Sequence, residues 1–324
     1  MRQDSLKPKA IALSRVENPS APTPDEADRT NSPSFILRGT KIAATQSETG
    51  LYIVATPIGN LSDITIRALD VLASCDLVVC EDTRKTRRLL ERFGIAARLA
   101  SYHDHSDETD RARILKHLEA GQSVALVSDA GTPLVSDPGF KLVSSAISDG
   151  HSVIPIPGPS SVTSALSAAG LPTNSFYFAG FVPNRSEARR KAFRQIAGYN
   201  TTLVFLDSPR RLAELLKDAQ GEFGDRPAAI AREMTKIHEQ FVRGSISELI
   251  AACERISTKG ELVLLIGPPT ESASELTQAE IDARLIEALE NMGINDAARL
   301  LAQETGLAKR QLYQRALSLR DQKL

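Results

Sequence analysis

The sequence predicts an α/β protein with two main domains: an N-terminal domain built on a mostly parallel sheet and a second domain of α+β type. A small helical appendage follows at the C-terminal end. The chain has 324 residues, enough for two domains at about 150 residues each. Short apolar runs alternate with helical patterns over residues 50–169, which is typical of βαβ units and a parallel sheet. Beyond residue 172 strands follow one another closely, which favours antiparallel pairing.

The first 48 residues are expected to be a disordered extension. They contain five prolines, many Ser, Thr and Ala residues and no sustained hydrophobic period, a composition that buries too little apolar surface to order itself. No apolar core of a secretory signal follows the early basic residues, and Asp25, Glu26 and Asp28 argue against a transit peptide.

The first folded domain is expected over residues 49–172. Four apolar runs are each followed by a helical pattern: 51–55 then 63–73, 77–80 then 82–92, 123–127 then 138–148, and 153–156 then 159–169. Two of the helix starts are marked by Pro138 and Pro159, because proline is favoured at the first helical position. Gly170 stops the last helix of the series.

The second domain is expected over residues 173–270, and a helical unit over residues 276–324. The predicted strands of the second domain are 176–181, 202–206, 228–232, 237–243 and 261–266. The helical unit begins with the capping box of Thr277 and Glu280, and two further helices flank the turn at Gly306. Its arrangement resembles a helix-turn-helix.

Composition excludes several classes of protein. Lys and Arg number 39 against 40 Asp and Glu, giving a net charge of −1, so binding to nucleic acid requires a local basic patch. Aromatic residues make up 5% and Trp is absent, which argues against a carbohydrate site built on stacking. Three cysteines without a C-x-x-C pattern indicate buried thiols in a reducing, cytoplasmic compartment. The longest apolar runs have the length of a strand, so we expect no membrane span.

Three loops at predicted strand ends could hold a ligand. They are residues 56–60, 128–133 and 157–161, all rich in small residues. Ligands of open α/β sheets bind at the carboxyl ends of the strands, and small side chains let a ligand approach the backbone closely. Neither the Rossmann pattern G-x-G-x-x-G nor the P-loop pattern occurs, so NAD and P-loop nucleotides are disfavoured. Ordinary βα turns remain the alternative interpretation.

Several long motifs occur in order: GLYIVATPIGNLSDITIRALDVL, EDTR, VSDAGTPLVSDPG, PIPGPSS, AGFVPNR and ELVLLIG. Together they resemble the ribosomal RNA small subunit methyltransferase I family of the tetrapyrrole-methylase superfamily, over roughly residues 50–320. The resemblance implies S-adenosylmethionine bound between two α/β domains and 2′-O-methylation of a cytidine in the decoding region of 16S ribosomal RNA. It implies small-subunit rRNA or the 30S subunit as partner, and we expect a homodimer. The cofactor-binding residues it implies are Pro57, Gly59, Ser128, Asp129, Gly131, Thr132, Pro133, Gly158, Ser160, Leu206 and Gly267.

Two other functions remain open at this level. One is methylation of a precorrin by a tetrapyrrole methylase proper, and the other is a non-catalytic RNA-binding α/β module. The basic run of the second domain and the helical tail favour RNA, because a small macrocycle needs neither.

Proton removal from a ribose hydroxyl needs a base close to the cleft. The motifs around Glu81 and Lys236 each place acidic and basic groups just beyond a predicted strand. We expect Glu81 or Lys236 to orient or deprotonate the hydroxyl, since a lysine near other cations loses its proton more easily. Arg84 is expected to position a neighbouring phosphate. The alternative for each residue is a helix cap or a surface ion pair.

RNA binding is assigned to two basic segments. The first comprises Arg185, Arg189, Arg190 and Lys191, and the second is the tail around Lys309 and Arg310. A solvated helix face or dimer packing would explain the same residues. The segment 103–105, His-Asp-His, could suggest a metal site, but methyl transfer from a sulfonium needs no metal and none is expected.

Overall fold

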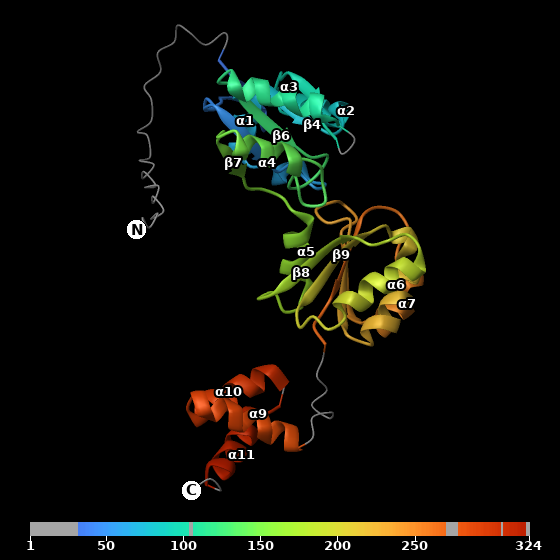
Figure 1. The fold of residues 1–324 in the computed structure, drawn as a ribbon. Coiled ribbons are helices and arrows are strands. Elements are labelled where there is room, and N and C mark those ends of the chain that lie inside the picture. The colour runs from blue at the N-terminus through green and yellow to red at the C-terminus, as the bar shows by residue number, and fades with distance from the viewer. Residues whose placement is uncertain (1–31, 104–105, 270–277, 306, 322–324) are drawn as a thin grey trace, which may run out of the picture.

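The computed structural model describes residues 32–103, 106–269, 278–305 and 307–321. Figure 1 shows two α/β units that follow each other along the chain and three helices near the C-terminus. Each α/β unit contains a five-stranded sheet.

The sheet of the first domain is entirely parallel, with the strand order β5-β4-β6-β3-β7. Its strands are β3 (Gly50–Val54), β4 (Leu77–Cys80), β5 (Leu99–Ser101), β6 (Ser123–Val127) and β7 (Val153–Ile156). Its helices are α1 (Ile66–Ser74), α2 (Thr83–Arg92), α3 (Glu108–Glu119) and α4 (Phe140–Ser148), with the 3-10 turn η1 (Leu61–Asp63). Successive side chains of each strand point alternately into two apolar clusters, one on each face of the sheet. Both sets are apolar, so the sequence of each strand is a continuous apolar run. The predicted α/β class with a mostly parallel sheet is confirmed.

A short hairpin precedes this sheet and corrects one expectation. Strands β1 (Ser34–Leu37) and β2 (Thr40–Ala43) pair antiparallel, and Phe35 is completely buried in the core of the first domain. The backbone N–H of Ile36 donates to the carbonyl of Phe93. The predicted disordered extension is therefore wrong for residues 34–43, because Phe35, Leu37 and Ile42 pack on the core of the first domain and anchor the hairpin there. Residues 1–31 lie outside the described part of the chain.

The second sheet has the order β11-β10-β12-β9-β8 and is antiparallel except for the parallel pair β8 and β9. Its strands are β8 (Phe176–Phe181), β9 (Thr202–Asp207), β10 (Pro227–Arg232), β11 (Gln240–Ser245) and β12 (Leu262–Ile266). Helices α6 (Ser186–Ile196), α7 (Leu212–Phe223) and α8 (Ile246–Ala252) pack on one face, with the short turns η2 (Pro209–Arg211) and η3 (Cys253–Arg255).

Helix α5 (Ser161–Ala169) covers the opposite face of the second sheet, as Figure 1 also shows. Val162, Ala165 and Leu166 share a buried cluster with side chains of β9, β10 and β12. The guanidinium of Arg243 on β11 donates to the carbonyl of Ala168. By packing, α5 belongs to the second domain, so the boundary lies between β7 and α5 and not near residue 172. Sequence periodicity shows that a helix is amphipathic but not which sheet it covers.

Three helices form the C-terminal unit: α9 (Gln278–Asn291), α10 (Ile294–Thr305) and α11 (Lys309–Asp321). Leu285, Ala298 and Leu312, one from each helix, lie in its buried core. Within the described ranges, no helix is long and apolar enough to cross a membrane.

Candidate functional site

The three loops singled out in the sequence lie side by side, because β3, β6 and β7 are neighbouring parallel strands. The backbones of Thr56 and Gly131 exchange two hydrogen bonds of 2.8 and 2.9 Å. The hydroxyl of Thr56 donates to the carbonyl of Ser128, and that of Thr132 donates to the carbonyl of Pro159. The first two loops are thus joined to each other, and the second is joined to the third.

Two glycines permit this close approach. Gly131 has φ +84° and is buried, a conformation that residues with a side chain rarely adopt. A Cβ at Gly158 would lie 3.0 Å from the Cβ of Ala55. The packing of the loops therefore requires the small residues of the two motifs.

A cavity of about 250 Å³ lies between the two domains, next to these loops. From the first domain and α5 it is lined by Ile58, Asp129, Ala130, Val135, Ser136, Asp137 and Ser161. From the second domain it is lined by Phe181, Leu206, Asp207, Glu233, Met234, Glu261, Leu262 and Val263. Left-handed backbone at Leu134, Ser136 and Glu233 surrounds it, with φ values of 70°, 64° and 49°. Such strained conformations concentrate at functional sites.

Carboxylates dominate the polar lining of the cavity: Asp129, Asp137, Asp207, Glu233 and Glu261. Asp207 is fully buried, and its Oδ1 accepts from Arg211 Nε at 2.8 Å while Oδ2 has no hydrogen-bond partner. Asp129 accepts from Lys85 Nζ at 2.6 Å and from the backbone N–H of Asp82. Asp129, Asp207, Glu233 and Glu261 each form an ion pair with a cation of the chain. Because Asp207 Oδ2 is buried without a hydrogen-bond partner, the cavity favours a ligand that donates a hydrogen bond to this atom.

The connector between β10 and β11 closes the cavity from the second domain. The hydroxyl of Thr235 accepts from the backbone N–H of Asn60 at 3.0 Å. Lys236 packs on the 56–60 loop so closely that a Cβ at Gly59 would lie 2.4 Å from its Cγ. The loop after β3 thus meets the second domain at this connector, and Ile58 of the loop also packs in the buried cluster with side chains of β9, β10 and β12.

Lys236 is held between two carboxylates, with Nζ 2.9 Å from Glu233 and 3.2 Å from Glu261. Burial alone would lower the pKa of Lys236, but the hydrogen bond to Glu233 and the charge of Glu261 outweigh burial and raise this pKa above its usual value. The same contact with Lys236 lowers the pKa of Glu233. The expectation of a lysine deprotonated by neighbouring cations is therefore wrong, because its neighbours are anions.

Glu81 lines a different, shallower hollow of about 440 Å³, together with Asp82, Thr83, Arg84, His103 and Asp129. Asp129 lines both this hollow and the interdomain cavity. Asp82 caps α2, and hydrogen bonds from the side chain and backbone of Arg84 lower the pKa of Asp82 to about 2. Arg84 itself is mostly exposed. The structure thus places Glu81 and Arg84 together and Lys236 beside the neighbouring cavity.

The residues predicted for the cofactor fall into three groups. Asp129 and Leu206 line the cavity. Pro57, Gly59, Ser128, Gly131, Thr132, Pro133, Gly158 and Ser160 belong to the adjoining loops, where Ser128 and Thr132 donate their hydroxyl protons within the loops. Gly267 does not line the cavity: Leu262 lines it, whereas Gly267 follows the opposite end of β12, about 16 Å away at the rise of an extended strand. Sequence shows that a strand ends there, but only antiparallel pairing shows which end faces the site.

Sequence reasoning missed most of the cavity lining from the second domain, such as Phe181, Met234 and Val263. It also overlooked Val135 to Asp137, although they lie within the VSDAGTPLVSDPG motif. Polar residues within that motif would have been a usable signal. For isolated apolar positions of the second domain no local signal exists.

The basic segment of α6 is largely neutralised by α7, and this corrects one expectation. Arg189 is completely buried, with its guanidinium 2.5 Å from Asp218, so it cannot contact RNA. Arg190 and Arg194 share the carboxylate of Glu222. Helix α7 carries an acidic residue at every fourth position: Glu214, Asp218 and Glu222. This spacing predicts an acidic face on α7, and it was the available signal that α6 would be neutralised.

Four of the basic residues predicted to bind RNA are exposed and unpaired within the described part of the chain. Arg185 and Lys191 are exposed and have no ion-pair partner in the described ranges, and the same holds for Lys309 and Arg310 at the start of α11. These four remain candidates for phosphate contacts.

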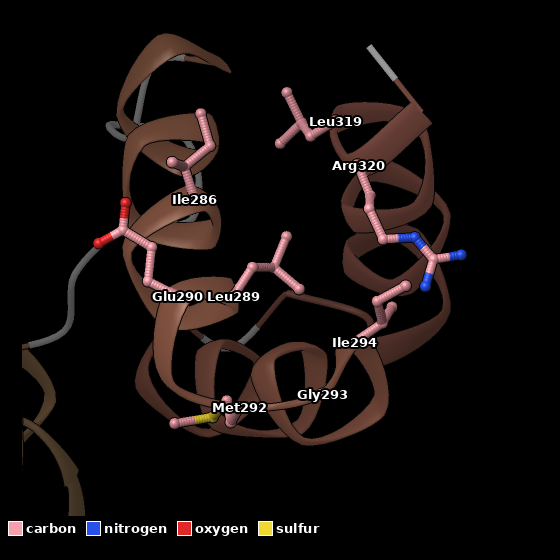
Figure 2. A pocket seen from close by; sticks show the side chains of 8 residues that line it. All are labelled: Ile286, Leu289, Glu290, Met292, Gly293, Ile294, Leu319 and Arg320. Atoms are coloured by element: carbon pink, nitrogen blue, oxygen red, sulfur yellow. The ribbon is translucent and has the colours of Figure 1, made fainter. Parts of the chain in front are cut away.

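A hollow of about 260 Å³ also lies in the C-terminal unit, between α9 and the end of α11. Figure 2 shows Ile286 and Leu289 on one side and Leu319 on the other, with the α9–α10 connection closing one end. Its lining is mainly aliphatic and lacks convergent polar groups, so it carries no catalytic assignment.

Metal and thiol chemistry receive no support here. In the described ranges, no group of three or more His, Cys, Asp or Glu residues could hold a metal ion. Asp104 and His105 of the His-Asp-His segment lie outside those ranges. All three cysteines are free, and burial raises the pKa of Cys75 to about 12, so that thiol stays protonated.

Comparisons with known proteins agree with the fold and the motifs. The family model described as Tetrapyrrole (Corrin/Porphyrin) Methylases matches residues 50–250, and the one described as RsmI C-terminal HTH domain matches residues 275–320. The ribosomal RNA small subunit methyltransferase I of Mesorhizobium japonicum is 47% identical over 87% of this chain and 96% of its own length. The protein of the same name from Escherichia coli O157:H7 is 42% identical over 85% of this chain and 97% of its own length.

Solved structures share the fold at lower identity. Diphthine synthase matches with a TM-score of 0.54 and 16% identity, covering 68% of this chain and 90% of its own. The methyltransferase CobJ matches with a TM-score of 0.52 and 18% identity, covering 68% of this chain and 95% of its own. The fold, the ordered motifs and the two family matches lead to one conclusion: the chain belongs to the ribosomal RNA small subunit methyltransferase I family of the tetrapyrrole methylases.

Proposed function

We propose that this chain transfers a methyl group from S-adenosylmethionine to the 2′-hydroxyl of a cytidine in the decoding region of 16S ribosomal RNA. Membership of the family supports methyl transfer to small-subunit rRNA, since the relatives carry that name over almost their whole length. It favours rRNA over a precorrin as the substrate. The observation that carries the proposal is the interdomain cavity, with its braced small-residue loops and acidic lining.

The residues present fit this cofactor. Gly131 packs behind Ile58, which lines the cavity, since a Cβ at Gly131 would lie 3.3 Å from Ile58 Cγ2. Asp207 Oδ2 is a buried acceptor without a partner, and a buried acceptor of this kind gains most from a ligand that donates a hydrogen bond. The α-ammonium of S-adenosylmethionine is such a donor, and carboxylates provide most of the polar lining of the cavity. When bound, the cofactor supplies a methyl group activated by the sulfonium charge.

The chain's own residues have three tasks in the proposed reaction. The loops after β3, β6 and β7 fix the methyl donor, and the connector with Lys236 closes the cavity above the 56–60 loop. Glu81, in the hollow that shares Asp129 with the cavity, accepts or orients the proton of the 2′-hydroxyl as the new O–C bond forms. Lys236 keeps its proton because of its two carboxylate neighbours, so its part is to orient and not to deprotonate.

Exposed cations hold the RNA; Arg84 also pairs with Asp82, and the others have no ion-pair partner in the described part of the chain. Arg84 is in reach of a phosphate beside Glu81, and Arg185 and Lys191 offer contacts on α6. Lys309 and Arg310 extend the contact to the helix-turn-helix unit. Phe140 and Ile147, both exposed on α4, offer an apolar surface for the second copy in a homodimer.

Methyl mapping tests the proposed function directly. In a strain lacking the gene, we expect one 2′-O-methyl group to disappear from 16S rRNA at a decoding-region cytidine and to return on complementation. Isothermal titration should show binding of S-adenosylmethionine to the purified chain. A complete set of ribose methyl groups in the deletion strain contradicts the proposal, and methylation at another nucleotide contradicts its finer part alone.

A further inference from the structure

Two exposed apolar side chains face the interdomain cavity from opposite domains. Val135, in the loop after β6, is 41% exposed, and Phe181, at the end of β8, is 67% exposed. Both line the cavity. The segments that carry them touch, since a Cβ at Gly180 would lie 3.0 Å from Ser136 Oγ.

Unusual backbone presents both side chains. Leu134 and Ser136, on either side of Val135, have φ values of 70° and 64°, a region that residues other than glycine rarely occupy. Gly180, directly before Phe181, has φ 70°, and the pairing of β8 with β9 shifts register between Phe178 and Gly180. A β-bulge re-aims the side chain that follows it and is common next to active sites. The left-handed residues and the bulge thus lie directly beside Val135 and Phe181, and they orient both side chains toward the cavity.

Exposure alone does not explain this arrangement. Phe140 and Ile237 are 75% and 93% exposed, but neither lines the cavity. Isolated apolar side chains on a surface are common. Val135 and Phe181 differ from such isolated side chains, because they come from two domains, line one cavity and each lie beside left-handed backbone. This arrangement indicates a ligand that has a flat apolar face.

We infer that Val135 and Phe181 form a subsite that stacks the base of the nucleotide whose ribose is methylated; this rests on the proposed function. Enzymes that withdraw a nucleotide from the stack hold its base between aromatic and apolar side chains, and single-stranded nucleic acid is commonly bound by stacking its bases on aromatic side chains. Phe181 provides the aromatic face and Val135 the opposing apolar wall. Because stacking tolerates any base, the subsite holds the nucleotide in place and does not by itself select cytosine.

The test is the steady-state methylation of 30S subunits that lack the modification. Phe181→Ala should lower kcat/KM by about 5- to 150-fold, the range corresponding to the stacking of one base on an aromatic side chain. Phe181→Tyr should keep kcat/KM near the wild-type value, whereas Phe181→Leu, which is apolar but has no π face, should fall with the alanine variant. Val135→Ala should cause a smaller loss.

Two further measurements separate this subsite from other roles of the same residues. Affinity for S-adenosylmethionine, measured by titration, should change by less than about 2-fold in Phe181→Ala, since the side chain is assigned to the RNA. The matched control is Phe176→Ala at the other end of β8, where a 46% exposed phenylalanine lies away from the cavity lining. It should retain wild-type kcat/KM.

Each other outcome overturns the inference in a recognisable way. A parallel loss of cofactor affinity in Phe181→Ala would assign the side chain to the cofactor. A change of molar mass in solution would assign it to an interface between copies of the chain. Wild-type kcat/KM in Phe181→Ala, or full activity in Phe181→Leu, would remove the stacking role while the proposed function stands. If the wild-type chain fails to methylate 30S subunits, the proposed function and the subsite fall together.

Discussion

Gly59 is the position where a single methyl group should disturb the closure of the cavity. Its φ lies outside the left-handed range, so alanine meets no backbone penalty. The added Cβ would lie 2.4 Å from Lys236 Cγ and 2.9 Å from Thr235 Oγ1. An ordinary carbon contact starts near 3.4 Å, so the Lys236 stem must retreat by about 1 Å. The variant Gly59→Ala therefore pushes the connector of the second domain off the 56–60 loop.

The magnitude follows from overpacking, which typically costs about 1–3 kcal/mol. The clash exists only while the connector lies on the loop, so separating the two segments relieves it. Binding of S-adenosylmethionine to the closed cavity must then overcome this strain, and the affinity should fall by about 5- to 150-fold. Titration calorimetry measures the loss directly.

A double-mutant cycle identifies the cause. Lys236→Ala removes Cγ, so Gly59→Ala should cost markedly less in that background, with a coupling energy of about 1 kcal/mol or more. The matched control is Gly221→Ala in α7, where a Cβ meets nothing within 4 Å. It should leave cofactor affinity unchanged and stabilise the helix by up to about 1 kcal/mol. Additive effects of Gly59→Ala and Lys236→Ala, or wild-type affinity in Gly59→Ala, would refute the packing argument.

Four further results are expected. Arg189→Ala should lower the free energy of unfolding in urea by about 3 kcal/mol, because it removes a completely buried side chain and leaves the partly buried carboxylate of Asp218 without its cation; a loss below about 1 kcal/mol would contradict the burial argument. Alanine at both Arg185 and Lys191 should weaken rRNA binding. The slope of log K against log salt concentration should become shallower by about 0.7 for each phosphate contact that is lost, and an unchanged slope would show that both side chains are merely solvated. Glu81→Gln should slow single-turnover methyl transfer by about 10² or more if Glu81 is the base. Lys236→Met should leave the neutral limb of the pH–rate profile in place, because the pKa of Lys236 is raised and this side chain stays protonated at neutral pH. By the same shift, the stability that Lys236 contributes is complete below the ordinary lysine pKa and is lost only as the pH rises through the higher value. A shift of the neutral limb in Lys236→Met would restore Lys236 as a base.

Local sequence was sufficient for the family and for the parallel domain. The apolar runs of β3, β4, β6 and β7 and the glycine-rich turns after them follow from periodicity and turn chemistry, which act over a few residues. The same signals predicted the loops that brace the cavity. Because the carboxyl ends of parallel strands always meet at one edge, the position of a loop after a strand was enough to place it at the site.

Tertiary structure decided what depends on partners distant in the chain. From the sequence, Arg189 is expected to bind RNA and Lys236 to act as a base or to orient the hydroxyl, but the folded chain places them beside the carboxylates of Asp218 and Glu261. Lys236 and Glu233 are three residues apart, yet the left-handed backbone at Glu233 and Thr235 sets their contact. Charge pairing falls off over a few ångströms, so a charge's role is fixed by its neighbours in space.

The same distinction explains the remaining differences. Antiparallel pairing of β12 put Leu262 at the cavity and Gly267 at the far end of the strand, and sequence gives no sign of strand direction. Helix α5 packs on the second sheet although it follows β7 of the first, since an amphipathic helix fits either sheet. Most segments become strands, helices or tight loops according to their own residues, because those choices depend on neighbours along the chain. The partners of α5, Arg189 and Lys236 depended on packing between segments far apart, which only the folded molecule brings together.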